Sequence, residues 1–164
     1  MTFSNVEALL KLIHEVVPNH PTFFQTVGAG QGNKDSNAFV KAVQSQVAAF
    51  FGENCKIEQK VGDSGMAVDY YFPDDKTIVE VARLVKNPNS EFHKDILKAM
   101  LAKSYFEVEH LIFFGGPGSK AACERPARRA IIDWVEAEHD IHIKVYDITT
   151  SSIDVLTGMV EGKG

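Results

Sequence analysis

The sequence predicts an α/β fold, with a mixed β-sheet flanked by helices on both faces. Three short strand-like segments follow one another between residues 55 and 85, as in an antiparallel meander. A helix, an apolar strand, a second helix and an alternating strand come next, an order typical of parallel strand–helix–strand units. At 164 residues the chain fits one domain, 1–164, with no linker long enough to divide it.

Two amphipathic helices precede the meander. The first spans residues 4–17, and the second runs from about residue 36 to 51 and ends at Gly52. Phe39, Val43, Val47 and Phe50 form the apolar face of the second helix. Glu7, Lys11 and Glu15 interrupt the apolar residues of the first helix, which argues against a signal peptide and for a cytoplasmic protein. No apolar run is long enough to span a bilayer, so we expect no membrane contact.

The meander consists of segments 55–61, 66–72 and 76–85, joined by GDSG at 62–65 and by a turn at 73–75. Ser90 caps a helix over 91–104. Its predicted inward residues are Phe92, Ile96, Leu97, Met100 and Leu101.

The last third of the chain predicts one strand–helix–strand unit. HLIFF at 110–114 is apolar throughout, as expected of a strand covered on both faces. Pro126 suits the first turn of a helix, and IHIKVYDI at 141–148 alternates like a strand. The tail, 149–164, is expected to fray.

Two carboxylates lie inside the predicted hairpin of strands 66–72 and 76–83. If Asp74 and Asp75 form its tip, paired residue numbers sum to 149, so Asp69 lies opposite Glu80 with Cβ atoms about 5 Å apart. Two like charges so placed repel unless a cation joins them. Carboxylates on rigid strands with room for water are typical Mg²⁺ ligands. The alternative is a solvated strand face, in which a slip of one residue would separate the two acids.

The order of elements and the Asp69-x10-Glu80 spacing resemble the PD-(D/E)XK, or restriction-endonuclease-like, nuclease superfamily. The resemblance covers about residues 36–148, and implies a core of helix, three-strand meander, helix and strand. It also implies that Asp69 and Glu80 bind Mg²⁺ or Mn²⁺ and that the substrate is DNA.

The chain departs from the superfamily motif at one position. The motif lysine should lie two residues after Glu80, where this sequence has Ala82. In the superfamily such a lysine can move to the following helix, and Lys94 is our candidate replacement. The alternative is that Glu91–Lys94 and Asp95–Lys98 are ordinary ion pairs on the helix surface.

Two further motifs have weaker functional interpretations. The glycine-rich loop after the apolar strand could bind an anion through its backbone amides, although such loops most often only turn the chain. Its residues are Gly115, Gly116, Gly118 and Ser119. Arg125, Arg128 and Arg129 could contact a nucleic-acid backbone, or could form a solvated helix face.

Three hypotheses about function follow. The first is a divalent-metal-dependent nuclease that hydrolyses DNA phosphodiester bonds. The second is a nuclease-fold module that has lost catalysis and serves binding or assembly, which the missing motif lysine and the net charge of −5 favour. The third is an anion- or nucleotide-binding protein that uses the glycine-rich loop. The sequence leaves DNA and a second copy of the chain open as partners.

Overall fold

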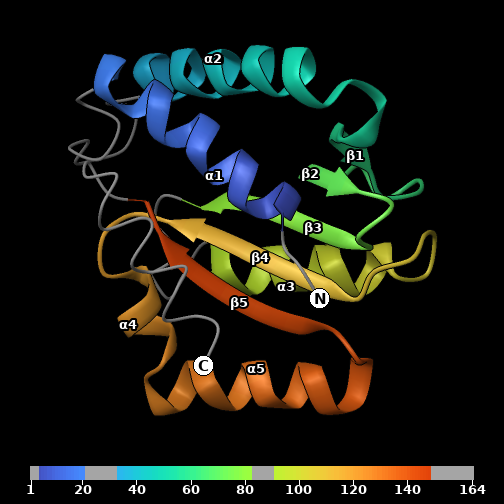
Figure 1. Cartoon of the computed structure of the whole chain (residues 1–164). Coiled ribbons are helices and arrows are strands. Elements are labelled where there is room, and N and C mark those ends of the chain that lie inside the picture. The colour runs from blue at the N-terminus through green and yellow to red at the C-terminus, as the bar shows by residue number, and fades with distance from the viewer. Residues whose placement is uncertain (1–3, 21–32, 83–90, 149–164) are drawn as a thin grey trace. The chain divides into compact units, whose positions relative to one another are not determined.

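The computed structural model describes residues 4–20, 33–82 and 91–148 (Figure 1). These residues form two compact units. One holds the described residues up to Glu53 together with Ile148, and the other is Asn54–Asp147. The single-domain assignment for 1–164 stays a prediction, and the expectation for the tail lies outside the described residues.

The first unit contains two helices that pack against each other, α1 (Ser4–Val16) and α2 (Asn33–Phe51). A short 3₁₀ turn, Val17–Asn19, follows α1, and another, Gly52–Asn54, follows α2. The buried face of α2 differs from the expectation at its end, because Phe51 is buried whereas Phe50 is 64% exposed. The four-residue steps from Phe39 through Val47 continue to residue 51, which explains the difference.

The second unit is built on a five-stranded mixed sheet in the order β1-β2-β3-β4-β5. The strands are β1 (Lys56–Lys60), β2 (Ala67–Phe72), β3 (Thr77–Ala82), β4 (His110–Gly115) and β5 (His142–Asp147). The first three pair antiparallel, and β4 pairs parallel with both β3 and β5. The predicted α/β class and the mixed sheet of meander plus strand–helix–strand are therefore confirmed.

The β2–β3 hairpin has the register that its sequence predicts. Tyr70 pairs with Val79, and Phe72 pairs with Thr77, so paired numbers sum to 149. The turn closes with a hydrogen bond from the Lys76 amide to the Pro73 carbonyl oxygen, 3.2 Å apart. Continued by one residue, this register sets Asp69 opposite Glu80.

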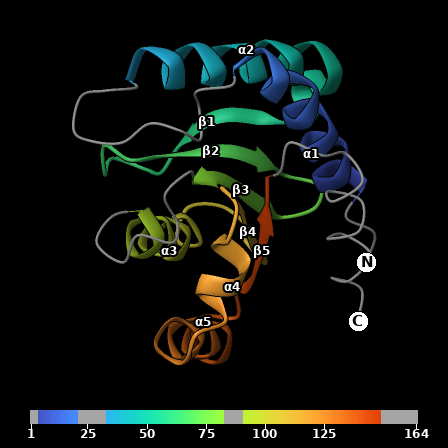
Figure 2. The same ribbon diagram turned by 90° about the vertical axis from the view of Figure 1, so that its left-hand side faces the viewer.

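Three helices belong to the sheet unit: α3 (Glu91–Ala102), α4 (Ser119–Cys123) and α5 (Pro126–His139). α3 contacts β2 and β3, and α5 contacts β5 (Figure 2). A single buried cluster joins α3 and α5 to the sheet through residues such as Phe92, Ile132 and Phe113. Each such side chain contributes about 1.5–3 kcal/mol by its burial. No helix within the described ranges has the length and apolar character needed to cross a membrane.

The face that α3 turns toward the sheet differs from the predicted one. Phe92 and Ile96 are buried as expected, but Leu97 is 55% exposed. Asp95 and Lys98 are buried instead. The helix is therefore rotated so that two charged side chains lie on its inner face, close to the hairpin.

Candidate functional site

The hairpin brings Asp69 and Glu80 together. The two side chains are hydrogen-bonded to each other, and Asp69 Oδ2 also accepts a hydrogen bond of 2.8 Å from the Val81 backbone amide. The Val81 contact fixes the orientation of the Asp69 carboxylate. Glu80 lies on the strand face that also carries Ile78 and Ala82, both in the buried cluster under α3.

Lys98 of α3 is the cation beside this acid pair. Its Nζ lies 2.9 Å from Glu80 Oε1, 2.8 Å from Asp95 Oδ1 and 3.1 Å from the Ala67 carbonyl oxygen. An ammonium group has three N–H donors, so these partners account for all of them.

This group of four residues, Asp69, Glu80, Asp95 and Lys98, is hereafter called the acid–lysine cluster. Glu80 is 2% exposed, Asp95 6% and Lys98 7%. With every group ionised, three carboxylates would face one ammonium and the cluster would carry two uncompensated negative charges. Such an excess is costly where water is excluded. Asp69 is only partly buried, but burial of the other two carboxylates favours a cluster that holds a proton or another cation.

The pKa values follow from this excess of acid. Burial raises the pKa of Glu80 well above its ordinary value, and the neighbouring Asp69 and Asp95 carboxylates raise it further. Burial also raises the pKa of Asp95, to about 6, although Lys98 opposes the change. Burial alone would lower the pKa of Lys98, but the carboxylates of Glu80 and Asp95 outweigh it and raise that pKa. Lys98 is therefore a permanent cation at neutral pH, and a hydrogen bond between two carboxyl groups is accounted for by a proton on one of them.

The predicted replacement lysine, Lys94, lies elsewhere on α3. Its side chain is exposed, whereas Lys98, one turn later, reaches the acid pair. The alternative interpretation of Asp95–Lys98 as an ordinary surface pair is wrong, because both side chains are buried, whereas the catalytic role of Lys94 stays a prediction. The signal that could have identified them is their spacing, since positions 95 and 98 lie on the same helical face as Phe92 and Ala99.

The glycine-rich loop already holds an anionic group that belongs to the chain. The Gly118 amide donates to Asp147 Oδ2 at 3.0 Å, and the Lys120 amide donates to Asp147 Oδ1 at 2.8 Å. Ser119 Oγ donates to the Gly116 carbonyl oxygen at 2.6 Å. An external anion would have to displace Asp147, a residue that the sequence did not single out. Gly115, the remaining member of this motif, ends β4.

The three arginines at the start of α5 do not form one exposed patch. Arg128 is buried, with its guanidinium 5.2 Å from the centre of the Phe92 ring. Arg129 pairs with Asp133 at 2.9 Å, one turn along the same helix. Arg125 is the N-cap residue of α5 and is exposed.

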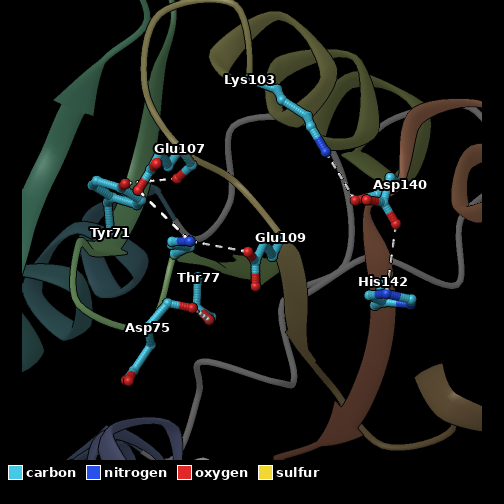
Figure 3. Close-up of polar contacts among 9 residues, drawn as sticks. Tyr71, Asp75, Thr77, Lys103, Glu107, Glu109, Asp140 and His142 are labelled. Carbon is cyan, nitrogen blue, oxygen red and sulfur yellow. Dashed lines mark hydrogen bonds and ion pairs between the residues drawn. The ribbon is translucent and has the colours of Figure 1, made fainter.

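A second polar network lies at the other end of β3, where that strand begins (Figure 3). Lys76 Nζ lies 3.1 Å from Glu109 Oε1 and 3.8 Å from Glu107 Oε2, and Tyr71 Oη donates to the Glu107 carbonyl oxygen at 2.6 Å. Lys103 Nζ donates to the carbonyl oxygen of Asp140, 2.9 Å away. The two lysines, Glu107, Glu109 and Asp140 border an open cavity of about 430 Å³. Both ammonium groups already have partners, so this network joins turns and loops at one end of the strands.

The acid–lysine cluster is a two-carboxylate metal site at most. Among the described residues, no group of three or more His, Cys, Asp or Glu side chains is arranged to hold a metal ion. Mg²⁺, however, commonly binds through one or two protein carboxylates and keeps waters or substrate phosphates as its other ligands. A cation could take the place of the proton between Asp69 and Glu80, so the donor chemistry fits such an ion.

Comparisons of the chain with protein-family models, with curated proteins and with solved structures find no significant match.

Proposed function

We propose that this protein is a divalent-metal-dependent phosphodiesterase of the PD-(D/E)XK type that acts on DNA. The observation that carries the proposal is the meeting of Asp69, Glu80 and a lysine ammonium on one face of the hairpin. Two features of the fold support it. The meander carries the two acids on its second and third strands, and a helix-connected parallel strand follows; this is the order of elements that the resemblance implies.

In this mechanism Asp69 and Glu80 would hold Mg²⁺ or Mn²⁺. The ion would supply an activated water and would neutralise charge on the phosphate. The Val81 amide keeps the Asp69 carboxylate oriented, and the burial of Glu80 strengthens every electrostatic interaction around it. Lys98 is too strongly protonated to accept a proton from water. Its role is to stabilise negative charge that develops on the phosphate oxygens.

The experiment that tests the proposal is a calorimetric titration of Mg²⁺ or Mn²⁺ into the protein and into Asp69→Asn. We expect binding heat that is lost in the variant, and cleavage of plasmid or single-stranded DNA that requires the same ion. Asp133→Asn is the matched control, because Asp133 is an exposed aspartate on α5, away from the acid pair. Binding heat that Asp69→Asn leaves unchanged would refute the assignment of the ligands.

One observation favours a second candidate function, a nuclease-fold module without catalysis. All three N–H groups of Lys98 already have partners in the chain, which leaves none for a substrate phosphate. In that case the cluster only fastens α3 to the hairpin. This alternative predicts neither cation binding at Asp69 nor cleavage of any DNA or RNA. It also predicts that replacing the cluster by apolar residues of similar volume preserves stability.

A further inference from the structure

Asp95 is a costly residue for a helix face that only packs against a sheet. It lies between Phe92 and Ala99 on the buried side of α3 and is 6% exposed. A buried carboxylate loses its hydration and needs a compensating partner. Its partner is Lys98, one turn along the same helix, at 2.8 Å. An apolar side chain at this position would pack without that cost.

Lys98 has one partner that the proposed reaction would take away. Of its three contacts only Glu80 belongs to the acid pair, while Asp95 and the Ala67 carbonyl do not. A divalent cation bound by Glu80 competes with the ammonium for the same carboxylate, and the two positive charges repel each other. Without Asp95, a Lys98 ammonium that lost Glu80 to the metal ion would have no counter-charge. It would then leave the site or lose its proton.

We propose that Asp95 is a positioning residue that keeps the Lys98 ammonium beside the acid pair when a cation occupies Glu80. This inference rests on the proposed function. Because Asp95 and Lys98 belong to the same helix, their ion pair does not depend on Glu80. The N–H that Glu80 gives up then becomes available to a substrate phosphate. All three N–H groups of Lys98 are therefore occupied within the chain only while no divalent cation is bound.

The test follows the exposure of Lys98 directly, without relying on activity. The protein, Asp95→Asn and Asp95→Glu are treated with an amine-acylating reagent with and without Mn²⁺, and modification of Lys98 is measured by peptide mass spectrometry. Asp133→Asn is the matched control, because Asp133 is also a helical aspartate paired with a nearby cation, but at the surface. Calorimetry with Mn²⁺ is run on each variant.

We expect Mn²⁺ to leave the rate at which Lys98 is acylated nearly unchanged in the protein without substitutions, in Asp95→Glu and in Asp133→Asn. In Asp95→Asn we expect Mn²⁺ to raise the acylation rate of Lys98 by about tenfold or more, which is the usual scale for loss of a supporting contact at a metal site. A merely structural Asp95 would give a rate that changes on substitution but does not depend on Mn²⁺. That result would overturn the proposal. Should Asp95→Asn not fold, Asp95→Ser carries the same comparison.

Kinetics and calorimetry separate this proposal from the proposed function. Asp95→Asn should lower kcat for DNA cleavage by about 10–100-fold with little change in KM, and should leave Mn²⁺ affinity close to that of the unmodified sequence. Absence of Asp69-dependent Mn²⁺ binding would overturn both proposals. If Mn²⁺ binds normally but Lys98 is protected from acylation equally well in Asp95→Asn with and without Mn²⁺, the role of Asp95 is overturned and the proposed function is not.

Discussion

Glu80 shows how a single residue can be stable only because of its neighbours. Its carboxyl group is almost entirely buried, beside two other acids and one ammonium. An isolated charge in such surroundings would be strongly unfavourable. The contact with Lys98 and the hydrogen bond with Asp69 reduce the cost, and the raised pKa removes part of the charge. Stability near this residue should therefore depend on pH.

We expect Glu80→Gln to become progressively more stable than the unmodified protein as pH rises from 5 to 8. The folded state holds the Glu80 proton more tightly than the unfolded state, so the protein loses stability as pH rises above the ordinary pKa of 4.5. Glutamine cannot lose a proton, and its amide can still donate to Asp69. Urea unfolding at several pH values measures the difference. The control, Glu138→Gln at an exposed position of α5, should show no such trend, and a trend of the opposite sign would contradict the raised pKa.

Lys98 and Lys94 allow a matched test of which lysine acts in the proposed reaction. They lie one turn apart on α3, but one is buried against the acids and the other is exposed. We expect Lys98→Gln to lower metal-dependent cleavage by about 100-fold or more, as loss of one charge-stabilising donor does. Lys94→Gln should cleave normally. Circular dichroism of both variants controls for folding, and equal loss in both would contradict the assignment.

Among the structural elements, the hairpin was the most predictable. Its register follows from alternation and from the short turn at residues 73–75, and these placed Asp69 opposite Glu80. The rotation of α3 was harder to predict. Its apolar residues allow more than one inward face, and the usual preference for charged residues outside favours the wrong one. The position of Lys98 depends on tertiary contacts with β2 and β3 that the helix sequence alone does not contain.

The connection between β4 and α5 was another place where local sequence was insufficient. Its glycines and serine indicate a turn that could bind an anion, and they also precede the short helix α4 that the sequence analysis missed. The group that the loop amides bind comes from Asp147, at the end of β5. A partner so distant in the chain could not be found from the spacing of the loop residues.

We expect Asp147→Ala to lower the free energy of unfolding by about 1–2 kcal/mol, the range observed when a carboxylate that caps backbone amides is removed. Chemical unfolding measures this change. Asp133→Ala is the control, since its surface pair with Arg129 contributes about 0.5 kcal/mol or less. Inorganic phosphate should protect the loop amides from hydrogen exchange in Asp147→Ala only. Protection by phosphate in the unmodified protein would revive the anion-binding hypothesis.

For the whole molecule, the charge distribution limits how DNA could be bound. The net charge is −5, and of the three arginines in the predicted patch one is buried and one is paired with Asp133. Long-range attraction to phosphates is therefore weak. Under the proposed function, the divalent cation must provide much of the positive charge that a phosphate meets.

DNA binding should accordingly depend on a divalent cation and only weakly on monovalent salt. Each phosphate neutralised by a protein cation contributes about −0.9 to the slope of log affinity against log salt concentration. With Ca²⁺ replacing Mg²⁺ to suppress cleavage, we expect a slope of about −2, corresponding to two such contacts. Fluorescence anisotropy of a labelled duplex measures it. Arg125→Ala should make the slope shallower by about 1, whereas the buried Arg128→Ala should leave the slope unchanged and lower stability instead. Tight binding without a divalent cation, with a slope several times steeper, would contradict this account.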